Sequence, residues 1–477
     1  MAKFYSSLSE IRSGLQRAEI TVEQLVRNYL DQIKKNAHLN AFNEVFEEEA
    51  LTSAKNVDNR IKNGTAGKLA GMVIAIKDNI CYKGHQVSAS SKILKDFTSI
   101  YSSTIVERLL AEDVVIIGRC NCDEFAMGGA NETSYFGPVK NQADETRVSG
   151  GSSGGSAVAV QANMCHAAIG TDTGGSVRQP ASFCGVIGFK PTYGRISRHG
   201  IIAFASSFDQ VGPITRSVED AALLLEVMAG PDEYDSTLAQ KEVPAFSSHI
   251  ETPGKKKIAY LQEALSSPGV DTEIKDKLVK AIDKLRAEGH TVTPIAFEQL
   301  DYLVPAYYIL AMAEASSNLA RFDGVHYGYR SPAATDLQST YKLSRSEGFG
   351  KEVKRRIMLG TFVLSAGYYD AYYAKAQKVR RLIQEKTDQI LKEYDFILVP
   401  TAPEPAFKIG TQEKDPIVMY LSDIFTVQAS LTGVPAISLP VGNNSQGLPL
   451  GLQLLTKHFN EQELLNFSKY FLELKEN

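Results

Sequence analysis

The sequence predicts a protein of the α/β class, and three observations support this. Helix and strand patterns alternate along all 477 residues. The expected strands are short apolar runs, such as "FILVP" and "VPAISLP". The segment "KKKIAYL" (255–261), a helix near 271–287 and "HTVTPI" (290–295) together predict a βαβ unit.

Two capping boxes, "SLSE" at 7–10 and "TVEQ" at 21–24, predict two N-terminal helices. Apolar residues of the second helix recur at helical spacing: Val22, Leu25, Val26, Tyr29, Leu30 and Ile33. The run "GMVIAIKDNI" (71–80) is too short for a typical helix. It predicts a buried strand that ends on Lys77. A helix and then a strand at 114–117 are expected to follow.

Later elements continue the alternation. Ser217 and Asp220 start a helix that we expect to end at Gly230-Pro231. A long helix is expected near 362–394, leading into the strand "FILVP". The chain has no internal repeat and no low-complexity tract, and the only linker-like composition, at 149–156, has core-like neighbours. We therefore expect residues 1–477 to form a single domain.

Composition excludes several classes of function. The net charge is −4, from 51 Lys and Arg against 55 Asp and Glu, and gives no electrostatic footprint for nucleic acid or a membrane surface. The N-terminus has no apolar signal-peptide core, and no apolar run reaches membrane-spanning length. Five cysteines are few and odd in number, which indicates a reducing compartment, so we expect a cytoplasmic protein. The pair Cys120 and Cys122 lacks partners at zinc-ligand spacing, and no metal site is expected.

The stretch "VSGGSSGGSAVAV" (148–160), followed by "TDTGGSV" (171–177), admits several interpretations. A phosphate-binding P-loop is set aside because neither glycine cluster is followed by Lys. "GGSSG" (150–154) satisfies the G-x-S-x-G pattern of Ser-Asp-His hydrolases, but the polar "NQADETR" (141–147) precedes it where a buried strand is needed. A plain tight turn is the simplest alternative.

The whole segment 150–197 resembles the signature of the amidase-signature family. The resemblance implies that family's fold, a central mixed β-sheet covered by helices on both faces, with a catalytic core near 70–200. It also implies a Ser–cis-Ser–Lys triad, with Lys77 as base, Ser152 as bridge after a cis Gly151 peptide, and Ser176 as nucleophile. Backbone N–H groups are then expected to form an oxyanion hole at Thr173, Gly174, Gly175 and Ser176.

Physical chemistry agrees with these roles. A serine hydroxyl is a poor nucleophile until a base takes its proton, and a lysine is a base only when neutral. Lys77 closes an apolar strand, where burial would disfavour the ammonium form. Taken alone, a lysine at a strand end would more often be a surface charge whose stem lies along the protein.

Three further segments, 124–141, 306–330 and 355–380, resemble the A subunits of bacterial and organellar amidotransferases that act on Glu-tRNA(Gln) and Asp-tRNA(Asn). The resemblance implies glutamine hydrolysis, with ammonia passed to a partner, the B subunit, which binds ATP and Mg²⁺ and holds most of the mischarged tRNA. The heterotrimer is completed by a small C subunit. No cofactor is expected in this chain. A free-standing amidase of the same family is the alternative, and it should lack these three segments.

The same resemblance implies how glutamine is recognised, in a part of the chain near 300–430. Arg356 is expected to bind the α-carboxylate and Asp423 the α-ammonium, with Tyr307 nearby. Considered alone, Arg356 in "KEVKRR" would be placed on a solvated helix face and Asp423 at a loop cap. Which of the two mischarged tRNAs is served, and by what route ammonia leaves, stay open at this stage.

Overall fold

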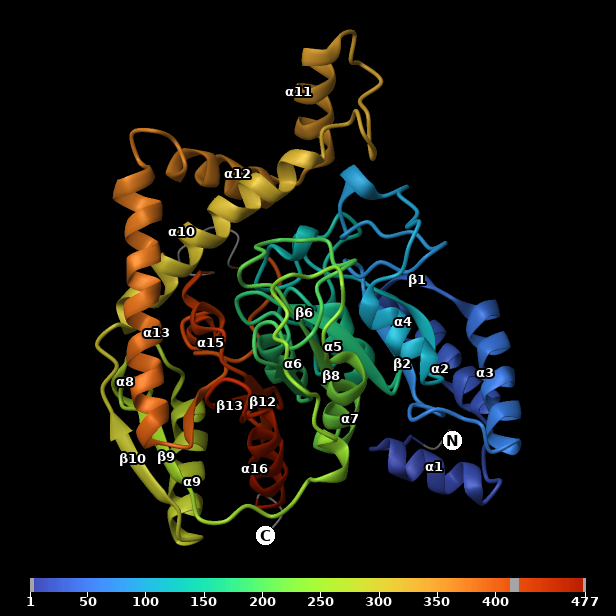
Figure 1. The fold of residues 1–477 in the computed structure, drawn as a ribbon, viewed down its shortest axis with the longest axis vertical. Coiled ribbons are helices and arrows are strands. Elements are labelled where there is room, and N and C mark those ends of the chain that lie inside the picture. Colours follow the sequence, from blue (N-terminus) through green and yellow to red (C-terminus); the bar gives the residue numbers. More distant parts are fainter. Residues whose placement is uncertain (1–3, 412–419, 475–477) are drawn as a thin grey trace.

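The computed structural model describes residues 4–411 and 420–474, and its centre is one mixed β-sheet of 11 strands (Figure 1). In spatial order these are β1 (Phe42–Val45), β3 (Val115–Cys120), β2 (Val73–Lys77), β6 (Ala167–Asp172), β8 (Gln210–Thr215), β7 (Ile187–Lys190), β12 (Ala436–Asn443), β13 (Pro449–Leu455), β11 (Phe396–Pro400), β9 (Lys257–Leu261) and β10 (Thr291–Ile295). Strands β3, β2 and β6 are parallel, as are β11, β9 and β10, and the strands between these two groups pair antiparallel. A separate hairpin joins β4 (Lys140–Asn141) to β5 (Asp144–Val148).

Helices cover both faces of the sheet, as the α/β prediction requires. On one face α5 (Gly154–Gln161) packs on β6 and β8, and α6 (Arg178–Cys184) packs on β7, β12 and β13. On the other face α7 (Val218–Met228) packs on β8, and α16 (Glu461–Glu473) packs on β12. Around the sheet lie α1 (Leu8–Gln16), α2 (Val22–Lys35), α3 (Glu47–Lys62), α4 (Thr104–Ala111), α8 (Glu263–Ser266) and α9 (Thr272–Ala287).

Both predicted N-terminal helices are confirmed, and Thr21 and Gln24 form the expected capping box of α2. The capping box predicted at 7–10 is wrong in one half: Ser7 accepts from the Glu10 N–H, but the Glu10 carboxylate accepts from the Ser6 N–H. The predicted strand that ends on Lys77 is β2, and all five of its residues are buried. The segment 255–295 is the expected βαβ unit, in which Thr291 pairs with Lys257 in parallel register.

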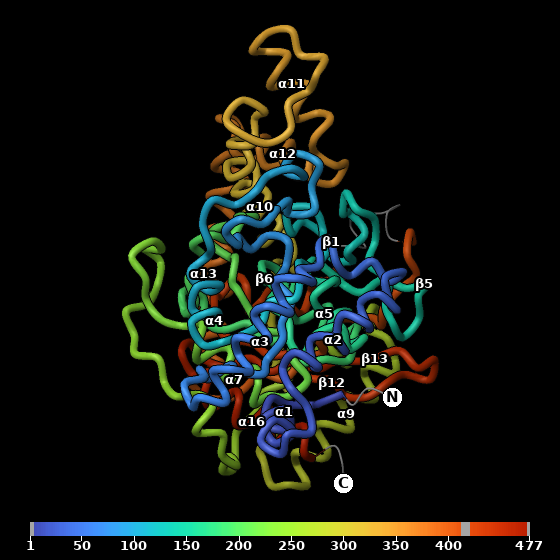
Figure 2. The backbone as a smooth tube through the Cα atoms, turned by 90° about the vertical axis from the view of Figure 1, so that its right-hand side faces the viewer, coloured from blue at the N-terminus to red at the C-terminus, as the bar shows by residue number. Residues whose placement is uncertain are grey.

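A helical layer lies beside the sheet, and its outer part projects beyond one end (Figure 1). It contains α10 (Leu300–Asn318), α11 (Leu337–Gly348), α12 (Lys351–Val363), α13 (Lys375–Glu393) and the short α15 (Val427–Thr432). Helix α10 packs against α12, α13 and α15, and α11 lies at the outermost tip in both views (Figures 1 and 2). This layer brings residues from beyond position 300 close to the glycine-rich loops.

The long helix expected near 362–394 is wrong in its first part. Helix α12 ends at Val363, a π-helical turn spans Tyr369–Ala374, and α13 begins at Lys375. The interruption contains Gly367, and glycine is among the weakest helix formers because it loses the most backbone freedom. Two helices at an angle therefore replace the single expected one (Figure 1).

The hydrophobic core runs through the whole sheet as one cluster, from Tyr5 in the N-terminal region to Phe471 in α16. A small second cluster, of Ala130, Val148, Phe183, Ala402, Ala406 and Phe407, lies beside the β4–β5 hairpin. The single-domain organisation stays a prediction. Among residues 4–411 and 420–474, no helix is both long enough and apolar enough to cross a membrane.

Candidate active site

Lys77 lies in the middle of the protein rather than on its surface. Strand β2 has β3 on one side and β6 on the other, so its last residue lies within the sheet, and Lys77 is 0% exposed. Burial is the main influence on its amine, and it lowers the pKa of Lys77 to about 8. The alternative of a surface charge is therefore wrong.

The Lys77 amine is surrounded by hydroxyl groups. Its Nζ lies 2.6 Å from Ser152 Oγ, 3.0 Å from Ser153 Oγ and 3.0 Å from Thr171 Oγ1. The first of these contacts joins two of the three predicted triad members. Ser153 and Thr171 were not predicted, and they hold the amine in place from two directions.

The loop that carries Ser152 follows the β4–β5 hairpin and leads into α5. The Gly151–Ser152 peptide bond is cis, as the family resemblance implied. Gly150 has φ of 77°, in the left-handed region that favours glycine. A side chain at Gly151 would collide with the carboxylate of Asp123. The glycines of "SGGSSGG" thus allow the backbone to turn in a crowded space.

Ser176 lies on the next loop, between β6 and α6. The Ser153 N–H donates to the Ser176 carbonyl over 3.1 Å, which ties the two glycine-rich loops together. The structure therefore brings the three predicted triad residues into one place. Ser176 is 7% exposed. Within residues 4–411 and 420–474, no hydrogen bond joins the Ser152 and Ser176 hydroxyls.

The predicted oxyanion loop presents backbone N–H groups. No acceptor among the described residues takes the N–H of Gly174, Gly175 or Ser176. Thr426 Oγ1 donates to the Gly174 carbonyl over 2.6 Å, and Thr173 Oγ1 donates to Asp209 over 2.7 Å. These bonds hold the loop from its other side, so its N–H groups stay available to a ligand.

Glycine is required at two positions of this loop. A Cβ at Gly174 would lie 2.5 Å from the hydroxyl oxygen of Tyr307, and Gly175 has φ of 137°, outside the range of other residues. Tyr307 thus covers the oxyanion loop. Behind the loop, the buried Asp172 pairs with Arg178 at 2.9 Å and also accepts from the Val177 N–H at 3.1 Å. This ion pair fixes the start of α6.

Arg356 is buried at 2% exposure, so a solvated helix face is the wrong interpretation. It lies on α12, and its Nε donates to Glu352 over 2.8 Å. The rings of Phe204, Tyr308 and Tyr420 surround its guanidinium, with centroids 5.3–5.7 Å away. Burial opposes the charged form of Arg356, but the Glu352 carboxylate outweighs it and the pKa of Arg356 is raised above its ordinary value.

Asp423 does not cap a helix with its side chain. Its Oδ2 accepts from the Tyr308 hydroxyl at 2.7 Å, and Tyr308 stacks on Tyr420. Burial raises the pKa of Asp423 to about 7, although Tyr308 and Arg356 oppose that shift. Sequence reasoning named Tyr307 and missed Tyr308. The adjacent pair of tyrosines on α10 was the available signal.

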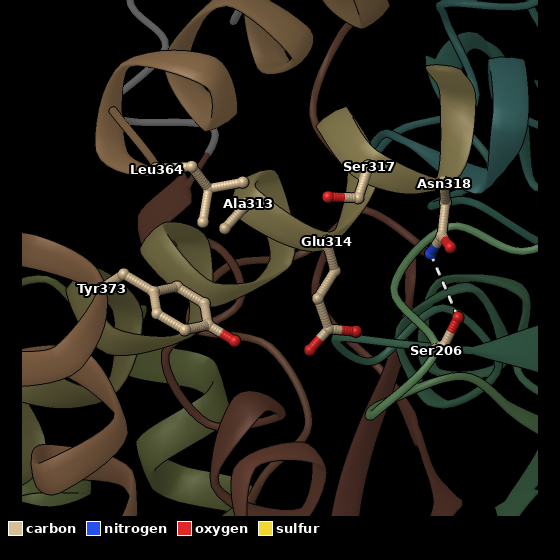
Figure 3. Close-up of a pocket in the computed structure, with 7 residues that line it drawn as sticks. All are labelled: Ser206, Ala313, Glu314, Ser317, Asn318, Leu364 and Tyr373. Atoms are coloured by element: carbon tan, nitrogen blue, oxygen red, sulfur yellow. Dashed lines mark hydrogen bonds between the residues drawn. The ribbon is translucent and has the colours of Figure 1, made fainter. Parts of the chain in front are cut away.

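A separate pocket of about 170 Å³ lies beside α10 and contains none of the predicted site residues (Figure 3). Its lining is Ser206, Ala313, Glu314, Ser317, Asn318, Leu364 and Tyr373. The Glu314 carboxylate lies in the middle of this view and accepts from the Ser207 N–H at 2.8 Å. Its carboxylate therefore has a structural partner already.

The possible ligands for a metal do not converge. All five cysteines are buried free thiols. In the part of the chain that the structure describes, no three His, Cys, Asp or Glu side chains gather as a metal site would need. The groups that do converge are an amine, hydroxyls and backbone N–H groups, which suit acyl transfer.

An α/β fold with a buried lysine hydrogen-bonded to a serine, beside a loop of free N–H groups, is typical of amide hydrolases that use lysine in place of histidine. The chain belongs to the Amidase family, which matches residues 24–465.

Relatives and solved structures agree with this assignment. The A subunit of glutamyl-tRNA(Gln) amidotransferase from Chlorobium luteolum is 50% identical, covering 98% of this chain and 96% of its own. The crystal structure of the same subunit from Thermotoga maritima has a TM-score of 0.78 at 39% identity, covering 96% of this chain and 92% of its own. A peptide amidase from Stenotrophomonas maltophilia has a TM-score of 0.84 at 27% identity, covering 99% and 97%.

Proposed function

We propose that this chain is the glutaminase subunit of a tRNA-dependent amidotransferase. It hydrolyses glutamine to glutamate and supplies ammonia for the amidation of Glu-tRNA(Gln), Asp-tRNA(Asn) or both. The observation that carries the chemistry is the 2.6 Å contact between the buried Lys77 amine and Ser152. The relatives that are about half identical along nearly the whole chain favour an amidotransferase subunit over a free-standing amidase.

The geometry supports a relay of protons through three residues. Neutral Lys77 takes the proton of Ser152, and Ser152 takes the proton of Ser176. The Ser176 Oγ then attacks the carboxamide carbon of glutamine. In this step the Ser152 and Ser176 hydroxyls must come into hydrogen-bond contact, and catalytic hydrogen bonds commonly tighten when substrate binds.

The tetrahedral intermediate carries its negative charge on the former amide oxygen. The free N–H groups of Gly174, Gly175 and Ser176 are the donors that would stabilise this oxyanion. Collapse of the intermediate breaks the C–N bond, and the proton held by the relay returns to the nitrogen, which leaves as ammonia. Water then attacks the acyl-Ser176 ester by the same relay, which releases glutamate and restores the serine.

Recognition of free glutamine needs one cation and one anion. Arg356 supplies a guanidinium whose fork matches a carboxylate, and Asp423 supplies a carboxylate for the ammonium. Both side chains meet Tyr308, which contacts the guanidinium with its ring and Asp423 with its hydroxyl. One tyrosine thus aligns the two predicted ligands, while Tyr307 lies over the oxyanion loop.

We further propose that the B and C subunits join this chain in a heterotrimer and that the complex works in the cytoplasm. ATP and Mg²⁺ belong on the B subunit, which would also hold most of the mischarged tRNA. The net charge of −4 on this chain fits a protein that leaves the nucleic acid to a partner. Because the reaction at Ser176 needs no cofactor, none is assigned to this chain.

The test is a glutaminase assay of this chain alone and in complex with the B and C subunits, with and without mischarged tRNA. We expect glutamate release by the complex and an increase when mischarged tRNA and ATP are present. The matched control is the complex with Ser176→Ala. A complex that amidates tRNA but releases no glutamate from glutamine would overturn the proposal.

A further inference from the structure

Gln179 holds a buried amide that the predicted site does not use. It is the second residue of α6, three positions after Ser176, and is 1% exposed. Its Oε1 accepts from the Gly151 N–H at 3.1 Å, directly before Ser152. A backbone N–H can only donate, so this contact fixes the orientation of the amide and turns Nε2 away from Gly151.

The Gln179 Nε2 group has no acceptor among residues 4–411 and 420–474, although it is buried. Buried polar groups are hydrogen-bonded in the great majority of cases, and an unpaired one costs about 1–3 kcal/mol. An orphaned donor in a cluster of predicted catalytic residues therefore points to an acceptor on the ligand.

Gly129 shows where that ligand would lie. Apart from its chain neighbours, a methyl group there would have two described heavy atoms within 4 Å: Gln179 Nε2 at 3.9 Å and Asp423 Oδ1 at 4.0 Å. Gly129 is not among the glycines with positive φ, so its conformation does not demand glycine. The space that a side chain at Gly129 would occupy therefore lies near one donor, Gln179 Nε2, and one acceptor, Asp423 Oδ1.

Those two atoms match the head group of an α-amino acid. The other oxygen of Asp423 is bonded to Tyr308, which leaves Oδ1 for an ammonium. Glutamine has two kinds of acceptor, and the oxyanion loop takes its carboxamide oxygen, so the α-carboxylate is the acceptor left for Gln179. The ammonium and carboxylate of glutamine are attached to one carbon, which suits a donor and an acceptor that both lie within 4 Å of one point at Gly129.

We propose that Gln179 is a specificity residue that donates from Nε2 to the substrate α-carboxylate, next to Arg356, and that Gly129 leaves room for the substrate α-carbon. This inference rests on the proposed hydrolysis of glutamine. Since Oε1 of Gln179 also holds Gly151, the same side chain connects recognition of the head group to the position of Ser152.

The first test is Gln179→Glu in the complex with the B and C subunits. This change keeps an oxygen for the Gly151 N–H and replaces the donor with an acceptor that repels a carboxylate. We expect KM for glutamine to rise at least tenfold, with kcat within a few-fold. The kcat/KM for 4-aminobutanamide, which is glutamine without its carboxylate, should change far less than the kcat/KM for glutamine.

The second test is Gly129→Ala, with Gly367→Ala as the matched control. Neither methyl group would meet a described atom closer than 3.9 Å, so both variants should unfold at the temperature of the unsubstituted protein. Only Gly129→Ala should weaken glutamine binding, by at least tenfold, measured by calorimetry in a Ser176→Ala background.

The outcomes distinguish failure of the role proposed for Gln179 from failure of the proposed glutamine hydrolysis. If the unsubstituted complex hydrolyses glutamine but Gln179→Glu leaves KM unchanged, or lowers kcat/KM equally for glutamine and 4-aminobutanamide, Gln179 is not a carboxylate ligand. If the unsubstituted complex neither binds nor hydrolyses glutamine, the proposed function itself fails, and this inference fails with it.

Discussion

The chemistry proposed for this chain depends on the protonation state of one lysine. Burial lowers the pKa of Lys77, while Asp123, Asp172 and Asp209 act in the opposite direction. The opposition from Asp172 is limited, because this carboxylate is paired with Arg178. The hydroxyls of Ser152 and Ser153 contact the amine without adding negative charge. With a pKa of about 8, the Lys77 amine is neutral in about half of the molecules at pH 8.

This assignment predicts the pH dependence of glutamine hydrolysis. Only the neutral amine accepts a proton, so kcat/KM should rise with pH through about 8 and level off above it, far below the ordinary lysine value of 10.5. Lys77→Arg should lose about two or more orders of magnitude, since arginine keeps its proton at these pH values. Steady-state rates from pH 6 to 10 check both points, and substantial turnover by the arginine variant would mean that Lys77 is only a structural cation.

Sequence reasoning reached Lys77, Ser152 and Ser176 because each belongs to an unusual local pattern. It did not reach Thr171, which is 94 positions from Lys77 in sequence and meets it only because β2 and β6 are neighbours in the sheet. Nor did it reach Gln179, because its unpaired Nε2 group can be recognised only from its contacts in the folded chain. Contacts that depend on the order of strands in the sheet can be identified only once the fold is known.

At the scale of elements, sequence patterns predicted boundaries well where local signals agree. Capping side chains mark α1, α2 and α7, and the alternation at 255–295 gave the βαβ unit. The break between α12 and α13 was missed because the tyrosine-rich segment around Gly367 lacks a proline or a capping pattern. The burial of Arg356 was also hidden, since it depends on how α12 packs against α10.

Helix α12 presents Arg356 and the turn before α15 presents Asp423, so variants of these two predicted recognition residues should separate recognition from catalysis. Arg356→Ala and Asp423→Ala each leave one end of glutamine unpaired, which costs about 1.5–3 kcal/mol, or roughly ten- to a hundred-fold in kcat/KM. Hydrolysis of an uncharged amide such as butanamide should change far less.

Rates measured on both substrates with each variant check this expectation, and Lys354→Ala, a change on the same helix, serves as control. Lys354 Nζ donates to the Ser346 carbonyl at 2.9 Å and touches neither Arg356 nor Asp423 in the described hydrogen bonds. Equal losses on glutamine and on the uncharged amide would assign Arg356 and Asp423 to support of the fold or triad instead.

At the scale of the whole molecule, the site lies where distant parts of the chain converge. The sheet supplies Lys77 and the loop of Ser176, the hairpin supplies the loop of Ser152, and the helical layer beyond residue 300 supplies the recognition groups. The catalytic core and the recognition part named from the sequence thus meet at one place, although they are far apart along the chain. Because the proposed chemistry ends at ammonia, we expect any amidation of tRNA to occur on another subunit of the proposed complex.

Separate sites for glutamine hydrolysis and tRNA amidation lead to a further prediction. Ser176→Ala removes the nucleophile but leaves the Lys77–Ser152 contact and the fold in place, so glutamine-dependent amidation by the complex with the B and C subunits should disappear. Ammonium salts should restore amidation, because ammonia can then reach the amidating site without glutamine. Amidation is measured as the conversion of mischarged tRNA with each nitrogen donor, and the unsubstituted complex should use both. If the variant used glutamine normally, Ser176 would not be the nucleophile. If ammonium salts failed while the complex stayed assembled, this chain would have a part in the amidation step as well.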